Sequence, residues 1–410
     1  MFYTYKIGIS AEEHDSFVKQ SPQANLLQSS QWATVKSEWR NERLGFFKDG
    51  KLVAVASLLI RRLVVPFGFT MIYIPRGPVM DYEDAELVSF VFKSIKEFAL
   101  RERSVVIKFD PFIRLSSKTI TGDREEELNV LAVKDRIVDL GGIWSGRVQT
   151  MSATIQPTYH AVLYSESFSE ESLNKRVRQN IRSARNKGIE IRIGREELLR
   201  DFSELLKKTE ERKSIRLRGR EYYQKILNAY PENSYIVVAY LDLAKRYEQL
   251  SYLEEKLVKV KEAMTFTSTT RQSKIENYKK ETRRINTELE MINFLIRNGS
   301  KLVPLAGTLT IDFAGTSENI YAGMDEKFKH YQPALLTWVE TAKYAFERGV
   351  KWQNLGGIEP TLDGGLYHFK SHLNPVVEEY IGEFDLIVSP ILYKIFQVLL
   401  EIRKKLRKKK

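Results

Sequence analysis

Two stretches in the middle of the chain carry apolar residues at the three- and four-residue spacing of a coiled coil. The first stretch runs from Leu243 to Met264 and the second from Ile275 to Ile296. A short polar segment rich in threonine and serine, residues 265–273, separates them and leaves room for little more than a reversal. The sequence therefore predicts an antiparallel helical hairpin over residues 241–298. It would be about 35 Å long, at about 1.5 Å per residue, and would project from the body of the protein.

On either side of this hairpin the same order of elements occurs twice. Residues 44–111 have the patterns of two strands, a third strand, an amphipathic helix and a further strand, and residues 235–357 repeat that order around the hairpin. We therefore predict a mixed α/β (α+β) fold with two similar subdomains and the hairpin inserted between two strands of the second. The expected boundaries are residues 1–153 for the first subdomain and residues 154–240 with 299–388 for the second.

The chain ends in a strongly basic segment. It has 65 Lys and Arg residues against 53 Asp and Glu, a net charge of +12, and seven of the last eight residues, 403–410, are basic. Apolar residues from Ile391 to Ile402 precede them at helical spacing, so residues 389–410 are expected to form a basic amphipathic helix. Such a helix either lies on an anionic membrane surface through residues 391–410 or docks on the body of the protein.

Several classes of protein find no support in the sequence. The chain has no cysteine, which excludes disulfides, thiolate zinc sites and a cysteine nucleophile. It has no long apolar run and no signal-peptide pattern, so a cytoplasmic location is expected. No metal-binding motif accompanies the five histidines, and His368 and His372 are expected to share a strand face without a carboxylate between them. The glycine pairs 356–357 and 364–365 are not expected to open a helix, which argues against a dinucleotide fingerprint.

The most informative single residue is Lys370, within GGLYHFKSHLNP (residues 364–375). A lysine beside Phe369 in an apolar segment, predicted here as a half-buried strand, is costly and suggests a functional ammonium group. Asp110 ends an apolar strand in VVIKFDPF, a position where mixed α/β folds place functional side chains, although an Asp-Pro turn explains it equally well.

Further candidates lie on predicted helices and turns. Lys36 and Trp39 belong to a helix that starts at Ser29 or Ser30, where Lys36 alone would be an ordinary surface lysine. Arg218 and Tyr222, four residues apart, would share a helical face and suit a pyrophosphate or nucleotide.

Two other basic features have ordinary structural explanations as well. Arg76 follows a strand in YIPRGPV and is explained equally well by a turn. Residues 167–188 predict a basic helix that starts near Ser169 and ends at Gly188, either as a solvated face or as a site for phosphates.

Taken together, these segments resemble the Fem family (FemABX) of non-ribosomal peptidyltransferases. These enzymes use aminoacyl-tRNA to add amino acids to the stem peptide of peptidoglycan precursors. The resemblance is greatest to the subgroup that builds branched stem peptides in streptococci, and within it to the enzyme that adds the second residue of the branch. It rests on motifs that span nearly the whole chain in order: QSSQWATVK (28–36), YIPRGPV (73–79), KFDP (108–111), RQNIRSARNKG (178–188), RLRGREYY (216–223) and GGLYHFK (364–370).

The resemblance implies two subdomains of the GNAT acyltransferase fold and a hairpin that assists tRNA binding, for which Arg271, Lys274, Lys279 and Lys280 are the candidates. It also implies roles for individual side chains. Those matching Lys36 and Arg218 contact the diphosphate of the precursor, Tyr222 lines the substrate channel, Asp110 lies at the acceptor side and Lys370 lies at the reacting centre. Trp39, Arg76 and Phe369 complete the expected substrate-binding set.

An aminoacyl-tRNA ester is already activated, so its transfer to an amine needs positioning and oxyanion stabilisation but no covalent enzyme intermediate. We expect Lys370 to supply that stabilisation, and Asp110 to position the acceptor first and to act as a base second. The expected partners are charged tRNA as co-substrate, the lipid-linked precursor lipid II and the inner face of the plasma membrane, with the protein as a monomer. No cofactor and no metal is expected.

The transferred residue is expected to be alanine or serine. Two alternatives remain open at this point: a CoA-dependent GNAT N-acyltransferase, and a non-catalytic RNA-binding coiled-coil adaptor.

Overall fold

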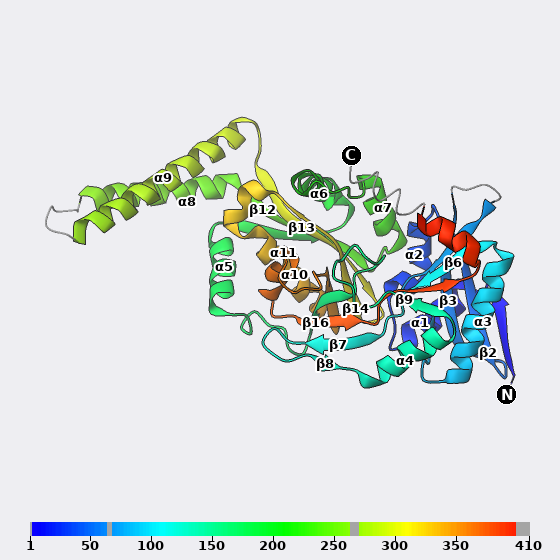
Figure 1. Ribbon diagram of the computed structural model, residues 1–410. Coiled ribbons are helices and arrows are strands. Elements are labelled where there is room, and N and C mark those ends of the chain that lie inside the picture. Colours follow the sequence, from blue (N-terminus) through cyan, green and yellow to red (C-terminus); the bar gives the residue numbers. More distant parts are fainter. Residues whose placement is uncertain (1, 64–67, 263–269, 399–410) are drawn as a thin grey trace.

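Two lobes, each built around one sheet, lie side by side, and a helical hairpin extends from the second lobe (Figure 1). The computed structural model describes residues 2–63, 68–262 and 270–398. The first sheet has the order β1-β2-β3-β4-β6-β17-β9, and β5 pairs with β3. Its strands are β1 (Tyr3–Ile7), β2 (Arg40–Lys48), β3 (Lys51–Arg62), β4 (Thr70–Ile74), β5 (Val79–Met80), β6 (Ser104–Phe109), β9 (Gly142–Trp144) and β17 (Phe384–Ile387).

The second sheet has the order β11-β12-β13-β14-β15-β10-β16-β7-β8. Its strands are β7 (Arg114–Lys118), β8 (Glu125–Glu126), β10 (Tyr159–Tyr164), β11 (Ile189–Gly194), β12 (Ser234–Asp242), β13 (Leu302–Phe313), β14 (Thr316–Met324), β15 (Trp352–Gly357) and β16 (Val376–Tyr380).

The predicted duplication is confirmed strand by strand. In the first lobe the chain runs β2, β3, β4, helix α3 (Ala85–Arg101) and β6; in the second it runs β12, β13, β14, helix α10 (Pro333–Glu347) and β15. In both lobes the helix connects two parallel neighbours, β4 with β6 and β14 with β15. The hairpin replaces a tight turn, because β2 and β3 are joined through residues 49–50, whereas β12 and β13 are joined through the hairpin.

The lobes exchange strands. The predicted division at residues 153 and 154 therefore does not assign every strand to the sheet in which it lies. The segment that carries β7 and β8 leaves the first lobe to pair with β16 of the second sheet. In return β17 enters the first sheet between β6 and β9. Each sheet therefore contains strands from the other half of the chain, and neither sheet is complete without them.

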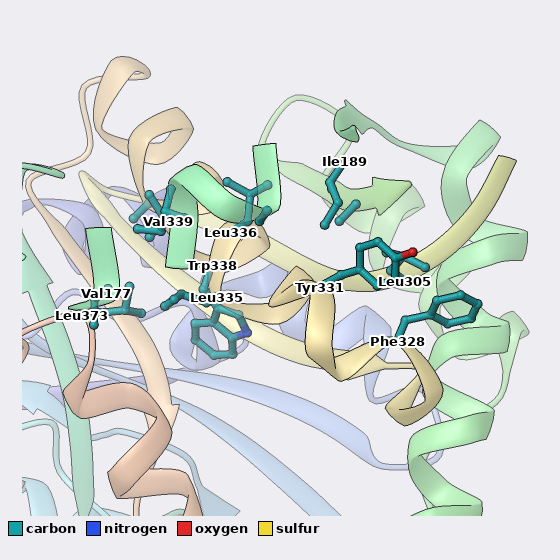
Figure 2. Close-up of a cluster of buried hydrophobic side chains, with 14 of the residues drawn as sticks. Val177, Ile189, Leu305, Phe328, Tyr331, Leu335, Leu336, Trp338, Val339 and Leu373 are labelled. Carbon is teal, nitrogen blue, oxygen red and sulfur yellow. The ribbon is translucent and has the colours of Figure 1, made fainter. Parts of the chain in front are cut away.

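The remaining helices cover the sheets and the lobe interface. They are α1 (Ala11–Gln20), η1 (Leu26–Gln28), α2 (Ser30–Val35) and α4 (Leu128–Asp139) in the first half, and α5 (Lys175–Asn186), η3 (Glu196–Leu198), α6 (Leu199–Lys213), α7 (Arg220–Ala229), η4 (Glu326–Tyr331) and α11 (Gly365–Ser371) in the second. Figure 2 shows the core beside α10, where Leu335, Leu336 and Val339 pack with Leu305 and Leu373. The predicted start of the basic helix α5 near Ser169 is wrong, because Asn174 caps it by accepting a hydrogen bond from the Val177 amide.

The hairpin consists of α8 (Leu243–Glu262) and α9 (Thr270–Arg297), which lie alongside each other (Figure 1). Leu250 and Ile292 are among the residues buried at its base. Arg246, which interrupts the apolar pattern, is buried and forms an ion pair with Glu288 at 2.7 Å. A buried charge is tolerated when it is paired and hydrogen-bonded, and this pair ties α8 to α9.

The end of the described chain is also helical. Residues 390–398 form a helix in which the Tyr393 hydroxyl donates to Asp385 of β17 at 2.6 Å. Ile391, Ile395 and Val398 are exposed on it. The basic residues 403–410 lie outside the described residues. No helix of the described part of the chain is long and apolar enough to cross a membrane.

Candidate functional site

Lys370 lies at the opening between β14 and β15. These parallel strands pair over Thr316–Glu318 and Trp352–Asn354 and then part. Lys370 is 5% exposed, and its Nζ donates a hydrogen bond to the Gly357 carbonyl oxygen at the end of β15 at 2.9 Å. Gly356 has φ 87°, a conformation that favours glycine, and a Cβ there would lie 3.4 Å from this Nζ, an ordinary contact distance.

The surroundings of Lys370 favour loss of its charge. Burial lowers the pKa of Lys370 to about 7, Glu359 opposes this shift and Lys213 adds to it. The Trp338 ring lies 5.6 Å from Nζ, which gives the ammonium a cation–π partner. At neutral pH the group is therefore a poorly solvated cation that is close to losing its proton.

A pocket of about 460 Å³ lies beside this lysine. Small residues line one side of it, Ala306 and Gly307 of β13 and Ala322 and Gly323 of β14, and Phe369 with Trp338 lines another. Its remaining lining includes Arg212 and Lys213, which belong to the end of α6, and Glu359. The pocket therefore combines an apolar side with two cations and a carboxylate.

Asp110 follows β6, as predicted, and is buried at the lobe interface. Its Oδ1 accepts a hydrogen bond from the Arg76 backbone amide at 3.2 Å, and its Oδ2 lies 3.4 Å from Arg76 Nη1. Burial raises the pKa of Asp110 to about 6, although the Arg76 charge and the Tyr73 hydroxyl oppose this shift. Asp110 and Arg76, which were predicted separately, thus form a single buried unit.

Three further buried residues connect Arg76 with the second lobe. His160 of β10 has its Nε2 2.9 Å from both Arg76 Nη2 and the Pro157 carbonyl oxygen. Burial, and next the Arg76 charge, lower the pKa of His160 to about 3, so its imidazole is neutral. On its other side the Asn354 amide lies within hydrogen-bond distance of His160 Nδ1 and donates to Glu318 at 2.7 Å.

Lys36 and Tyr222 meet at the other end of the lobe interface. Lys36 follows α2, which Ser29 caps as predicted, and its Nζ donates to the Tyr222 hydroxyl of α7 at 2.7 Å. Burial, and next the nearby Arg218, lower the pKa of Lys36 to about 8. The Arg218 guanidinium lies 4.9 Å from the Tyr222 ring centre. Two cations and a phenol are thus gathered where α2 of one lobe packs on α7 of the other.

Trp39 is separate from this cluster. It is half-buried against Ala33, Leu59 and Tyr73, and the Arg61 guanidinium lies 5.4 Å from its ring centre. The structure gives it a packing role on the first lobe. Phe369 lines the pocket and packs edge-on against Trp338 at 5.9 Å, as a residue beside the reacting centre would.

The structure corrects three local predictions. Lys370 lies on helix α11 and not on a strand, and Gly364 together with Gly365 does open that helix. Leu366, Phe369 and Leu373 have helical spacing, and Asn374 with φ 53° turns the chain before Pro375. Arg218 precedes α7, which starts at Arg220, so it reaches Tyr222 from a loop and not from a shared helical face.

The predicted cations of the hairpin lie on α9. Lys274, Lys279 and Lys280 are exposed, and Arg271 is near the start of the helix. Lys279 and Lys280 line a hollow of about 760 Å³ at the hairpin base together with Arg283, Arg284, Lys327 and His330. Next to it, Lys187 donates to the His330 carbonyl oxygen at 3.0 Å. This surface is suited to a polyanion.

Sequence reasoning missed Glu318, Asn354 and Trp338 and gave His160 no role. Each of these residues belongs to a segment whose apolar pattern predicts an ordinary strand or helix. The one available signal was the polar pair Gln353-Asn354 inside a buried strand, since buried polar residues need partners. Among the described residues no group of three His, Asp or Glu side chains is placed to hold a metal ion.

The chain is similar to known proteins over nearly its whole length. The sequence model of the FemAB family matches residues 9–401. Lipid II:glycine glycyltransferases of Staphylococcus aureus, including that of strain MRSA252, are 28–29% identical over 412 residues and cover 96% of this chain and 95% of their own length. The crystal structure of FemX matches with a TM-score of 0.74 at 25% identity over 96% of this chain and 99% of that one. A tandem GNAT protein of clavulanic acid biosynthesis matches with a TM-score of 0.51 at 7% identity over 94% of this chain and 99% of that one, which shows a shared fold.

Proposed function

Because the chain belongs to the FemAB family, we propose that it transfers an amino acid from aminoacyl-tRNA to an amine on the stem-peptide branch of a lipid-linked peptidoglycan precursor. The observation that carries the proposal is the buried Lys370 ammonium beside a pocket at the parting of β14 and β15. The relatives in Staphylococcus aureus, named as lipid II:glycine glycyltransferases, support the acceptor class.

The pocket suits the aminoacyl ester. Small residues form one side of it, and Gly323 lets α6 pack closely on β14, since a Cβ there would come within 2.9 Å of the Leu205 carbonyl oxygen. Arg212 and Lys213 line the same pocket and match the terminal phosphates of a tRNA. We propose alanine or serine as the transferred residue, because small residues (Ala306, Gly307, Ala322 and Gly323) form one side of the pocket.

Transfer proceeds by attack of the acceptor amine on the ester carbonyl carbon. A C–N bond forms, the C–O bond to the ribose breaks, and the proton lost by the amine ends on the ribose oxygen of the released tRNA. Lys370 stabilises the negative charge that develops on the carbonyl oxygen, because a cation in a poorly solvated site interacts strongly with a nearby anion.

Asp110 orients the acceptor and takes part in the proton transfer. An ordinary carboxylate, with a pKa near about 3.9, is a weak base toward an ammonium. The raised pKa of Asp110, about 6, brings it closer to a useful value. Arg76 holds this carboxylate in place through its backbone amide and its guanidinium.

Lys36 and Arg218 are the proposed binding groups for the precursor's diphosphate. Both lie where α2 and α7 meet, so the diphosphate would bridge the two lobes. The Lys36 pKa of about 8 is a consequence of burial beside another cation, and a bound anion would restore the charge.

The hairpin and the C-terminal helix have proposed roles in binding the two large substrates. The cations of α9, namely Arg271, Lys274, Lys279 and Lys280, bind the tRNA backbone. The exposed apolar face with Ile391 and Ile395 supports a proposed association with the inner face of the plasma membrane, where the lipid-linked acceptor would lie. The protein acts there as a monomer and needs no cofactor.

One assay tests the reaction and its rivals. The purified protein is mixed with lipid-linked precursor, unbranched or carrying one branch residue, and with alanyl-, seryl- or glycyl-tRNA, or with acetyl-CoA instead. The proposal predicts deacylated tRNA and a precursor longer by one residue, with the singly branched precursor preferred. Acylation from acetyl-CoA alone would establish the CoA-dependent alternative, and tRNA binding without any product would establish the adaptor.

A further inference from the structure

Glu318 occupies the point at which β14 and β15 part. It is the last residue of β14 that pairs with β15, where it lies opposite Asn354. It is buried, and burial raises its pKa to about 7, while Arg76 is the largest influence in the opposite direction. A carboxyl group in such a position needs partners, because an unpaired buried charge is strongly destabilising.

Both oxygens of this carboxylate accept hydrogen bonds from side-chain amides. Oε2 accepts from Asn354 Nδ2 at 2.7 Å, and Oε1 accepts from Asn25 Nδ2 at 3.1 Å. Asn25 belongs to the first lobe and Asn354 to the second. Glu318 therefore links the two lobes through two donors that point at the same group.

The Asn354 side of this link leads to Lys370. Asn354 Oδ1 accepts from the Gly356 amide at 2.7 Å, and the next residue, Gly357, provides the carbonyl oxygen that accepts from Lys370 Nζ. The orientation of the Asn354 amide thus fixes the backbone turn on which the ammonium rests.

The same amide leads to Asp110 by a second route. Asn354 Nδ2 lies 2.8 Å from Nδ1 of the His160 imidazole, and Arg76 Nη2 lies 2.9 Å from its Nε2. His160 in turn packs against Arg76, which holds Asp110.

The Asn25 side leads to Lys36. Asn25 Oδ1 accepts from the Leu27 amide and caps η1, and η1 leads directly into α2, which ends at Lys36. One carboxylate therefore connects the supports of all three groups to which the reaction assigns a role.

We propose that Glu318 is the positioning residue that holds Lys370, Asp110 and Lys36 in register across the lobe interface, an inference that rests on the proposed transfer function. It acts without touching substrate, through Asn25 and Asn354. Its charge is required because it must accept from both sides at once.

A glutamine cannot replace it. Whichever way the amide introduced by E318Q is turned, its NH2 faces either Asn25 Nδ2 or Asn354 Nδ2, and two donors then oppose each other. Turning Asn25 instead would set its NH2 against the Leu27 amide. In the double variant N25D/E318Q every donor meets an acceptor again. The carboxylate introduced at position 25 accepts from both the Leu27 amide and the new glutamine NH2, while the glutamine oxygen accepts from Asn354.

The test compares steady-state transfer by the wild type, E318Q, N25D and N25D/E318Q. We expect E318Q to lower kcat at least tenfold, because Lys370 and Asp110 are misplaced, and to raise KM for the lipid-linked precursor, because Lys36 is misplaced with them. KM for aminoacyl-tRNA should stay within threefold. N25D, which sets two carboxylates against each other, should be impaired as well, and the double variant should recover to within threefold of the wild type. Wild-type kcat in E318Q, or a double variant no better than N25D, would overturn the proposal.

A matched control and a measurement without substrate separate this proposal from the proposed function. Asp312 is another buried acid of the second sheet, paired with Arg348 at 2.7 Å, and D312N should leave kcat within twofold.

In the absence of substrates, acetylation of Lys370 by a small amine-reactive ester is followed by peptide mass spectrometry. E318Q should change that rate at least threefold, whereas D312N and N25D/E318Q should not. If the wild type transfers nothing, the proposed function fails, and the acetylation rate of Lys370 alone decides the role of Glu318. An unchanged acetylation rate in E318Q would then refute the positioning role of Glu318.

Discussion

Lys370 donates a hydrogen bond to the Gly357 carbonyl oxygen at 2.9 Å, across the opening between β14 and β15. The contact uses one of the three N–H donors of the ammonium group. The other two N–H donors can form hydrogen bonds to a developing oxyanion. Burial makes each such hydrogen bond stronger than it would be in water. Loss of this one ammonium group should therefore be felt in both catalysis and stability.

Replacing Lys370 by methionine should abolish most of the transfer activity while the fold is kept. Methionine has a similar length without the charge, so the loss reports the electrostatic contribution, which for one such donor is more than about a hundredfold in kcat. Single-turnover measurement with bound substrates checks this. K48M, at a lysine whose Asp84 partner lies on the first lobe, should retain wild-type rates; equal rates in K370M would remove Lys370 from the mechanism.

The same lysine predicts how stability depends on pH. Its pKa falls from 10.5 in the unfolded chain to about 7 in the folded protein, so between these values the unfolded state binds the proton that the folded state has lost. The cost of burying this charge is therefore fully present below about pH 7 and disappears as the pH rises toward 10.5. The wild type should gain stability relative to K370M over that range, by on the order of 1 kcal/mol per pH unit. Urea unfolding of both proteins at pH 6, 7.5 and 9 measures the difference, and a constant difference would contradict the assignment.

Lys36 should act in binding and not in the chemical step. We expect K36M to raise KM for the lipid-linked precursor about tenfold or more and to leave kcat within threefold, since a diphosphate contact made equally in the ground and transition states contributes to binding alone. Y222F, which removes the hydroxyl that accepts from Lys36, should have a smaller effect in the same direction. A fall in kcat with unchanged KM would place Lys36 at the reacting centre instead.

The basic surface at the hairpin base should govern affinity for tRNA. Charge reversal in K279E/K280E should weaken tRNA binding at least tenfold and reduce its dependence on salt, because fewer counterions are released. K259E/K261E makes the same change in charge on exposed lysines of α8, outside the hollow, and serves as the matched control. Titration of tRNA at two salt concentrations distinguishes them, and equal effects of both double variants would show that position on the hairpin does not matter.

The C-terminal helix should bind anionic lipid through its exposed apolar face. Ile391 and Leu128 are both 76% exposed, but only Ile391 lies on that helix. We therefore expect I391D to weaken flotation with phosphatidylglycerol vesicles several-fold and L128D to leave it unchanged. Undiminished flotation of I391D would favour an interaction confined to the basic residues 403–410.

Much of the fold could be predicted because it depends on local patterns. The hairpin follows from heptad spacing and the duplicated lobes from the alternation of strands and helices, and both are set by neighbours a few residues apart. Lys36, Asp110, Arg218, Tyr222 and Lys370 belong to recognisable motifs, and the structure brings each of them to the lobe interface or to the pocket beside it.

The sequence by itself determined most of the helices and strands, although not helix α11 around Lys370, and it marked Lys370 and Asp110 as charged side chains in apolar surroundings. It did not determine the exchange of β7 and β17 between the sheets or the link from Asn25 through Glu318 to Asn354. These contacts join residues up to 293 positions apart, and no local pattern records which distant donor will meet a given acceptor. The tertiary structure decided them, because a polar group is satisfied inside a protein only by whatever partner the packing of the whole chain brings within reach.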